Sequence, residues 1–257
     1  NNGLPNNTVS VPNDLTAAER TRFYEQMLRG GAQTPGLGGT QGFRYIRLAM
    51  GLYLRGLDAD QKQIVERFPG QLALLRELVE QSGAEGVAAE YWSPAPYWKS
   101  NGSFIGGSLK QFDAAFLGQM GDAMVQDIAY LEGNGVPVVQ WGLQNEPHIV
   151  NSIYSTCGYT NEQYYAAFKV VAAKVRAAYP DMYIHADSNA GQNGRGGALI
   201  RGDSAALALV DGWTWHRIGT DSNEQITENY QANAAGKDVF NNEFEYLTGG
   251  TSDARMI

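Results

Sequence analysis

The stretch that decides the fold runs Pro137-Val138-Val139-Gln140-Trp141-Gly142-Leu143-Gln144-Asn145-Glu146-Pro147-His148. Its apolar first half predicts a short buried strand, and the proline near its end predicts that the backbone leaves the sheet there. A carboxylate fixed at the end of a strand has a defined position that a carboxylate on a loop lacks. Glu146 is therefore the first candidate for a catalytic acid or base, although a glutamate that caps a surface turn would give the same pattern.

The composition of the 257 residues, 43% hydrophobic and 18% charged, is that of a globular protein with a large core. The sequence contains no run of about 18 apolar residues, which a membrane span would need, so we expect no membrane partner. The formal net charge of -8 argues against nucleic acid, because its binding relies on Lys and Arg contacts to phosphate. The single cysteine, Cys157, excludes an internal disulfide and a multi-cysteine metal site. We expect neutral or weakly charged ligands and neither a metal nor a cofactor.

From residue 43 onward, apolar runs typical of strands alternate with patterns typical of helices. The predicted strands cover 43–50, 86–92, 137–143, 182–187, 212–216 and 238–245. The predicted helices cover 16–29, 70–82, 108–132, 160–178, 203–210 and 223–235. A hydroxyl three residues before a Glu or Gln predicts a helix N-cap, and this spacing occurs at Thr16, Ser108, Thr160 and Ser222.

Strands that alternate with helices predict a parallel sheet, either an open doubly wound sheet or a closed barrel. Polar residues follow nearly every predicted strand: Arg47, 90–98, 145–146, 187–189, His216, and Glu243 or Glu245. A barrel brings all its strand ends to one mouth, whereas an open sheet concentrates its site at one switch point. We therefore expect an α/β fold, a (β/α)8 TIM barrel.

About six of the eight units of such a barrel are visible in the sequence. We expect residues 1–257 to form a single catalytic domain whose first and last strands lie outside this sequence. A further segment of the polypeptide, or another chain, would then complete the barrel.

Two carboxylates at the ends of different strands, Glu146 and one of Glu243 or Glu245, predict paired carboxylate chemistry, as glycoside hydrolysis requires. Aromatic residues near strand ends could stack on sugar rings, although each alone is more often part of a core. These residues are Trp92, Tyr97, Trp98, Trp141, Trp213 and Trp215.

Several motifs carry a resemblance to a known family. The run 141–147, Trp-Gly-Leu-Gln-Asn-Glu-Pro, resembles the acid/base strand of the retaining glycoside hydrolases of clan A. The run 92–102 and the Gly-Gly-Ser-Leu of 106–109 resemble glycoside hydrolase family 30, with an alanine between the two prolines as a departure. The run 239–243, Val-Phe-Asn-Asn-Glu, is similar to the nucleophile strand, which favours Glu243 over Glu245. The resemblance covers roughly 43–246.

This resemblance implies a role for each matching residue. Glu243 would be the nucleophile and Glu146 the acid/base, with a proton on Glu146 in the free enzyme. Arg47 would steady the nucleophile and keep it ionised, Asn145 would bond a sugar 2-hydroxyl, and His216 would bond substrate or nucleophile. The remaining residues expected to bind substrate are Trp92, Tyr97, Trp98, Trp215 and Glu245.

The implied function is that of a secreted, retaining endo-β-glycanase acting on a polysaccharide or oligosaccharide of the xylan, β-glucan or galactan type. The alternative is a carbohydrate-binding protein that keeps the aromatic cleft without turnover. An enzyme with an open sheet and unrelated chemistry would need a phosphate loop, or a nucleophile with its base, at one switch point. Neither is found in the sequence.

Overall fold

The computed structural model describes residues 15–29, 33–34, 38–39, 42–50, 64, 66, 70–190, 196–218 and 231–245. Its centre is a parallel sheet in which each strand pairs with the next one along the chain, in the order β3-β4-β5-β6-β7-β8. These strands are β3 (Tyr45–Met50), β4 (Gly86–Tyr91), β5 (Val138–Gly142), β6 (Tyr183–Ala190), β7 (Gly212–Ile218) and β8 (Asp238–Glu245). All six predicted strands are confirmed, and β6 continues three residues farther than expected.

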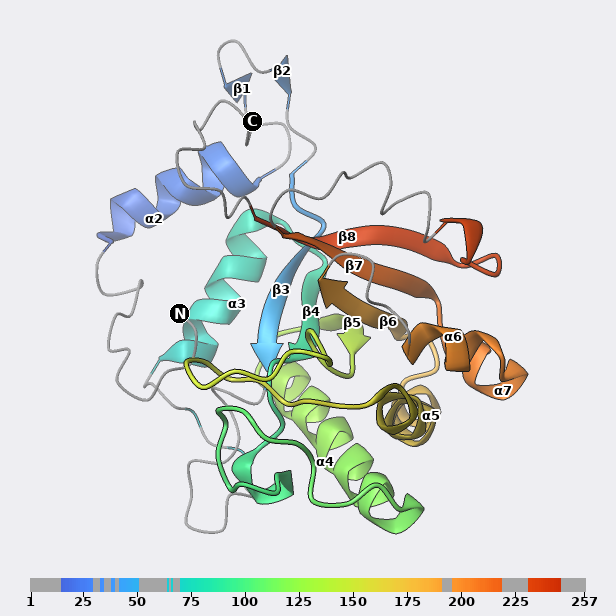
Figure 1. Cartoon of the computed structure of the whole chain (residues 1–257). Helices are drawn as coiled ribbons and strands as arrows, with labels where there is room; N and C mark the ends of the chain where they lie inside the picture. The colour runs from blue at the N-terminus through green and yellow to red at the C-terminus, as the bar shows by residue number, and fades with distance from the viewer. Residues whose placement is uncertain are drawn as a thin grey trace.

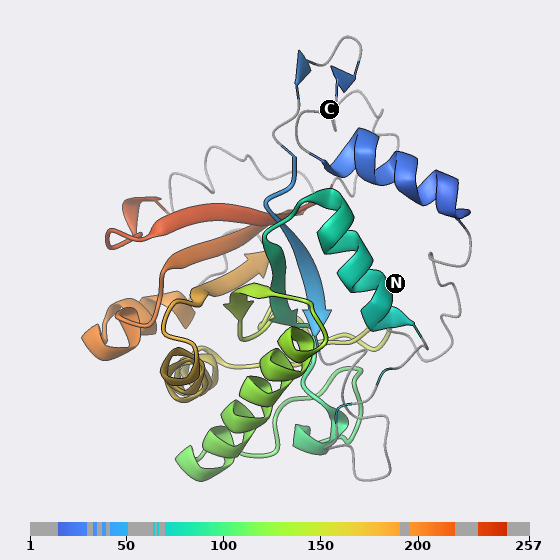
Figure 2. The same cartoon turned by 180° about the vertical axis from the view of Figure 1, so that it is seen from behind.

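Helices connect these strands and cover the outside of the sheet (Figure 1). They are α3 (Gln71–Ser82), α4 (Ala114–Gly133), α5 (Asn161–Ala178), α6 (Gly196–Arg201) and α7 (Ser204–Leu207). The first helix, α2 (Ala17–Phe23), continues as the π-helical turn η1 (Tyr24–Leu28). Seen from behind, α2 lies near α3 (Figure 2). Arg20 of α2 donates a hydrogen bond of 2.9 Å to the carboxylate of Glu77 in α3. A 3-10 turn, η2 (Pro96–Trp98), and a short antiparallel pair, β1 (Gln33–Thr34) with β2 (Gly38–Gly39), complete the described elements.

The capping boxes predicted at Thr16 and Thr160 are both present. The predicted helix start at Ser108 is wrong. Helix α4 begins at Ala114, where the carboxylate of Asp113 accepts bonds from two backbone N–H groups of the first turn. Ser108 lies in the preceding loop, because its carbonyl accepts a 2.9 Å bond from the backbone N–H of Ser100.

One other helix prediction needs correction. The helix predicted over 203–210 is only the four-residue α7, and α6 before it was not predicted. The helix predicted over 223–235, with its cap at Ser222, falls mainly outside the described residues.

The sheet is rolled into a partial barrel. In a flat sheet, five strand spacings would place β3 and β8 roughly 24 Å apart. Instead, Arg47 of β3 forms an ion pair with Glu243 of β8. Only a curled sheet brings the side chains of its first and last strands together, so the prediction of a barrel rather than an open sheet is confirmed.

Side chains alternate between the two faces of each strand. The outward set packs against the helices and forms the hydrophobic core, which includes Trp141, Ile184 and Trp213 from the sheet and Leu117, Ile128 and Phe168 from the helices. The inward set is polar at the carboxyl ends of the strands and contains fully buried charged and hydrogen-bonding groups, among them Glu90, His185 and His216. Buried polar groups cost stability unless they are paired, so this inner cluster is a candidate for function.

Two long loops beyond β4 and β5 are joined by Lys99. Its buried ammonium donates to Ser93 Oγ at 3.0 Å, to the Phe104 carbonyl at 3.0 Å and to the Thr156 carbonyl at 2.5 Å. Burial lowers the pKa of Lys99 to about 8. All three N–H donors of the ammonium therefore have acceptors, which ties the two loops into one packed unit beside the mouth of the barrel.

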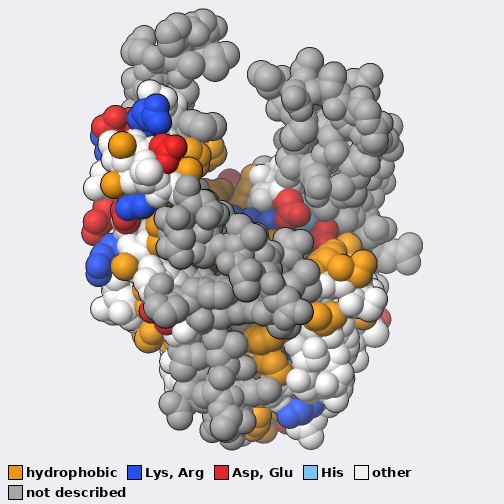
Figure 3. Space-filling model, turned by 90° about the vertical axis from the view of Figure 1, so that its left-hand side faces the viewer, with side chains coloured by type: hydrophobic (Ala, Val, Ile, Leu, Met, Phe, Trp, Pro, Cys, Tyr) orange, Lys and Arg blue, Asp and Glu red, His pale blue; other side chains and the backbone are white. Residues whose placement is uncertain are grey.

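Acidic and basic side chains are interspersed on the face shown in Figure 3. Neighbouring charges of opposite sign pair elsewhere at the surface too, as Arg44 does with Glu85 at 2.8 Å. Within the described part of the chain, no helix is long and apolar enough to cross a membrane.

Candidate active site

Glu146 lies four residues beyond the end of β5 and is fixed by its backbone. Its N–H donates to the carbonyl of Ser188 at 2.9 Å, and the N–H of Asn145 donates to the carbonyl of Tyr91 at 2.8 Å. The φ angles of Glu146 and Ser188 are 45° and 50°, in the left-handed region that non-glycine residues rarely adopt. Such strain gathers at functional sites, and here it occurs at two residues that bond each other.

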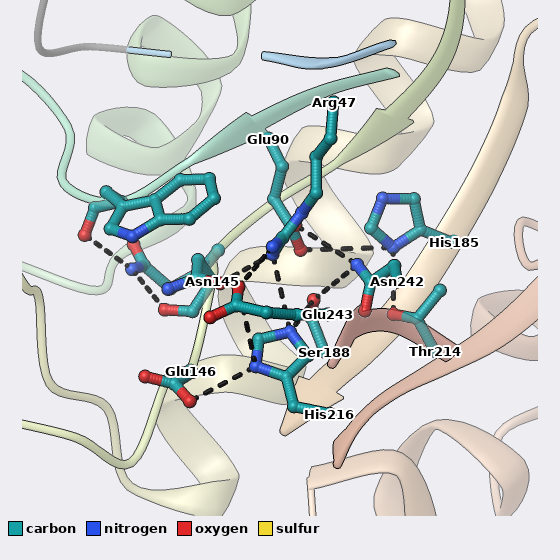
Figure 4. A network of polar contacts seen from close by, with 12 residues as sticks. Arg47, Glu90, Asn145, Glu146, His185, Ser188, Thr214, His216, Asn242 and Glu243 are labelled. Atoms are coloured by element: carbon teal, nitrogen blue, oxygen red, sulfur yellow. Dashed lines mark hydrogen bonds and ion pairs between the residues drawn. The ribbon is translucent and has the colours of Figure 1, made fainter. Parts of the chain in front are cut away.

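Glu243 reaches the same mouth from β8 because of an irregularity in the sheet. Trp215 pairs with Asn241 and His216 pairs with Glu243, so Asn242 is an extra residue on β8. Such a bulge re-aims the side chains that follow it. Asn242 and Glu243 therefore both contact the inner cluster, although regular alternation would place them on opposite faces (Figure 4).

Arg47 is the centre of this cluster and bonds several groups at once. It donates to Glu90 Oε2 through Nε at 2.9 Å and through Nη2 at 2.5 Å, and to Asn145 Oδ1 at 2.6 Å. Its Nη1 donates to Glu243 Oε2. The guanidinium also stacks on the ring of Trp92, with 4.4 Å from Cζ to the ring centroid. Its fork of fixed donors thus holds both carboxylates in defined positions.

His216 lies between the two candidate catalytic carboxylates. Its Nδ1 is 3.1 Å from Glu146 Oε1 and 3.9 Å from Glu243 Oε2. Its Nε2 is 3.3 Å from Arg47 Nη2 and 3.2 Å from Ser188 Oγ, so Nδ1 is the ring nitrogen that faces the two carboxylates. The two carboxylate oxygens are no farther apart than these two distances together, which puts Glu146 and Glu243 at the same mouth.

A third carboxylate, Glu90, is fully buried under this pair. Burial by itself would raise its pKa, but the positive charge of Arg47, with contributions from His185 and His216, outweighs burial and holds the pKa at about 2. Glu90 also accepts a 3.3 Å bond from Asn242. The cluster therefore contains a permanently ionised carboxylate that is closed off from solvent.

His185 supports the cluster from β6. Its Nδ1 is 3.1 Å from Thr214 Oγ1 and 3.9 Å from Glu90 Oε1. Burial lowers the pKa of His185 to about 4, so the ring is neutral at physiological pH. The glycine at position 142 makes room for it, because a Cβ there would lie 2.2 Å from the ring carbon Cε1 of His185.

The structure brings together Arg47, Trp92, Asn145, Glu146, His216 and Glu243 of the residues that the sequence predicts for the site. It separates three others from this cluster. Trp98 is buried and packs edge-on against Phe116 with ring centroids 5.4 Å apart, and Tyr97 packs against Trp98 and under Lys110. Trp215 belongs to the hydrophobic core, because it faces outward where His216 faces inward. The side chain of Glu245 lies outside the described residues.

Glu90 and Ser188 fall within the polar runs 90–98 and 187–189 that the sequence marks at strand ends, but the sequence predicts no role for either, and Asn242 was not predicted as a member of the cluster. Ser188 Oγ is 3.2 Å from His216 Nε2 and accepts a 3.0 Å bond from Asn242. The available signal was weak: Glu90 and Asn242 each lie within a predicted strand, where a polar residue in an apolar run predicts an inward-facing group. Among the residues that the structure describes, no group of three or more His, Cys, Asp and Glu side chains could hold a metal ion.

No family model matches the chain, and no curated protein matches its sequence. Solved structures resemble its fold. An endo-β-1,6-glucanase matches with a TM-score of 0.71 and 18% identity, over 88% of this chain and 52% of that one. A family 30, subfamily 8 xylanase from Clostridium acetobutylicum has a TM-score of 0.55 and 21% identity, over 76% and 46%. The catalytic domain of a family 30 xylanase from Talaromyces cellulolyticus has a TM-score of 0.59 and 13% identity, over 92% and 68%.

In fold, the chain resembles the family 30 glycoside hydrolases. The resemblance that its motifs carry thus extends to the arrangement of its strands and helices. The chain spans about half the length of the first two of these proteins. At such low sequence identity the similarity supports the fold alone, so function has to be argued from the residues of the site.

Proposed function

We propose that this protein is a glycoside hydrolase that cuts β-glycosidic bonds within a polysaccharide, with retention of anomeric configuration. The observation that carries this proposal is that Glu146 and Glu243 both lie within 3.9 Å of Nδ1 of His216. Retaining double displacement uses two carboxyl groups at one site, one as nucleophile and one as acid/base, and this pair can fill both roles.

In the first step, a carboxylate oxygen of Glu243 attacks the anomeric carbon and forms a C–O bond. The bond to the leaving oxygen breaks, and Glu146 gives that oxygen its proton. In the second step, water attacks the anomeric carbon, Glu146 takes its proton, and the bond to Glu243 breaks. Both carboxyl groups return to their starting states, so no other reactant is consumed.

The neighbouring groups fit these roles. Arg47 donates to Glu243 and holds the attacking carboxylate in position. Asn145 uses its carbonyl oxygen to accept from Arg47, which leaves its amide N–H groups to donate to a sugar 2-hydroxyl. Trp92 supplies a flat face backed by Arg47, on which a sugar ring can stack.

The substrate we propose is a β-glucan or a xylan, because the structural neighbours are named an endo-β-1,6-glucanase and xylanases. Galactans are a further candidate from the motif resemblance. A polysaccharide is too large to enter a cell, so we propose that the enzyme acts outside the cell.

The test is release of reducing ends from β-1,6-glucan, from xylan and from galactan by the purified protein. Glu146→Gln and Glu243→Gln should each lower the rate at least about 100-fold. Glu132→Gln, which removes an exposed carboxylate of α4, is the matched control and should have the rate of the wild type. Proton NMR of the first product should show the β-anomer. Binding of a polysaccharide without any turnover would support a carbohydrate-binding protein instead.

A further inference from the structure

Glu90 has no place in the two-step reaction described above, yet it is the most deeply buried charge in the cluster. It is 0% exposed and lies at the carboxyl end of β4, beneath Arg47 (Figure 4). Two of the four hydrogen bonds that Arg47 donates go to Glu90 Oε2, and one goes to Glu243. One guanidinium therefore balances two carboxylates, of which only Glu243 would change its charge during the reaction.

The charge on Glu243 disappears when it becomes an ester of the anomeric carbon. Arg47 cannot respond by losing its proton, because a guanidinium stays protonated in proteins. Its side chain is only 17% exposed, so a positive charge left there without a partner would be costly. Glu90, held ionised with a pKa of about 2, still accepts its two bonds from Arg47 in that state.

We propose that Glu90 is a positioning residue that serves as the permanent counter-ion of Arg47 and thereby stabilises the glycosyl-enzyme intermediate. This inference rests on the proposed function. Glu90 does not touch the substrate. It acts through Arg47, which it holds in place while the bond between Glu243 and the sugar forms and breaks. Asn242, which donates to Glu90 Oε2 at 3.3 Å, supports it from the bulge beside Glu243.

The experiment measures the two steps separately with 2,4-dinitrophenyl 2-deoxy-2-fluoro-β-glycosides of glucose and xylose, which label the nucleophile of a retaining enzyme. In Glu90→Gln, formation of the labelled enzyme should slow roughly 10- to 100-fold, because the ester leaves Arg47 without a negatively charged partner. Release of the label should be as fast as in the wild type or faster, because the same intermediate is destabilised. A merely structural role would slow both steps by a similar factor.

Two further variants complete the design. Glu90→Asp keeps the charge, so its ratio of the two rates should stay near that of the wild type. Glu85→Gln, which removes the carboxylate of an exposed ion pair just before β4, should change neither rate.

A crystal structure of the labelled wild-type enzyme tests the same point without any substitution. Arg47 should still bond Glu90 while its contact with Glu243 lengthens. Equal slowing of both steps in Glu90→Gln, or an Arg47 that leaves Glu90 in the labelled enzyme, overturns this inference alone. A wild-type protein that is never labelled and cuts no polysaccharide removes the proposed function, and this inference with it.

Discussion

His216 Nδ1 lies 3.1 Å from Glu146 Oε1 and 3.9 Å from Glu243 Oε2, so one imidazole nitrogen contacts two carboxylates, one from the loop after β5 and one from β8. The ring is fully buried and held on its other side by Ser188 and Arg47. Both carboxylates therefore contact the same nitrogen of a ring that is itself held in place. The distinct partners of Glu146 and Glu243 then predict distinct chemical behaviour.

We expect azide to distinguish the two carboxylates. Glu146→Gly and Glu243→Gly should each lose about 100- to 10,000-fold in rate. Azide placed in the space of Glu146 should yield a β-glycosyl azide, and azide in the space of Glu243 an α-glycosyl azide. Glycine tolerates the left-handed backbone at position 146, so that variant should stay folded. The measurement is NMR of the azide products, and the same anomer from both variants would contradict the assignment.

We expect Arg47→Lys to be a severe change despite its conserved charge. A lysine offers one ammonium and cannot bond Glu90, Asn145 and Glu243 in the fork geometry that arginine provides. The rate at saturating substrate should fall about 100-fold or more. The matched control is Arg44→Lys, three residues earlier, whose exposed pair with Glu85 should contribute little to stability and nothing to the rate. Comparable losses of activity in both variants would show that the cluster around Arg47 is not required.

Gly142→Ala should destabilise the protein and displace His185. The added Cβ would lie 2.2 Å from His185 Cε1 and 2.4 Å from Nε2, and Thr214 holds the ring in place. We expect a loss of roughly 1–3 kcal/mol in the free energy of unfolding, as for other overpacked cores. Gly118→Ala, in helix α4 with no neighbour near its added Cβ, should instead be stabilised by about 0.5–1 kcal/mol. Urea unfolding of both variants tests this, and an unchanged midpoint for Gly142→Ala would refute it.

His185 should make the stability depend on pH. Burial lowers its pKa from 6.5 to about 4. The unfolded chain therefore binds a proton below pH 6.5, whereas the folded protein does so only near pH 4. The contribution of His185 to stability is complete above pH 6.5 and is lost as the pH falls toward 4, up to about 3 kcal/mol.

The measurement is the free energy of unfolding at pH 7, 5.5 and 4.5 for the wild type and for His185→Asn. Burial raises the pKa of Asp187 from 3.8 to about 7, so Asp187 opposes His185 by losing stability as the pH rises. The contribution of His185 alone is the free energy of unfolding of the wild type minus that of His185→Asn. This difference should favour the wild type most at pH 7 and become smaller at lower pH. A difference that does not change with pH would contradict the prediction.

Local pattern was sufficient to predict the six strands, the capping boxes at Thr16 and Thr160, and the polar residues at the strand ends. It failed where contacts between distant segments decide the outcome. Helix α4 does not start at Ser108, because pairing between Ser100 and Ser108 holds that residue in a loop. Trp98 and Trp215 are aromatic residues near strand ends, as a sugar site would need, yet packing against helices and core takes them away from the mouth.

The sequence by itself determined the alternation of strands and helices and placed Glu146 and Glu243 at strand ends, because hydrophobic period, proline and capping residues act within a few positions. Only the tertiary structure decided that Arg47 meets Glu243, 196 residues away, and that Glu90 lies beneath both. The roll of the sheet and the bulge at Asn242 produce these contacts. Alternation along β8 would put Asn242 and Glu243 on opposite faces, and the register between neighbouring strands, which no local pattern encodes, turns both inward.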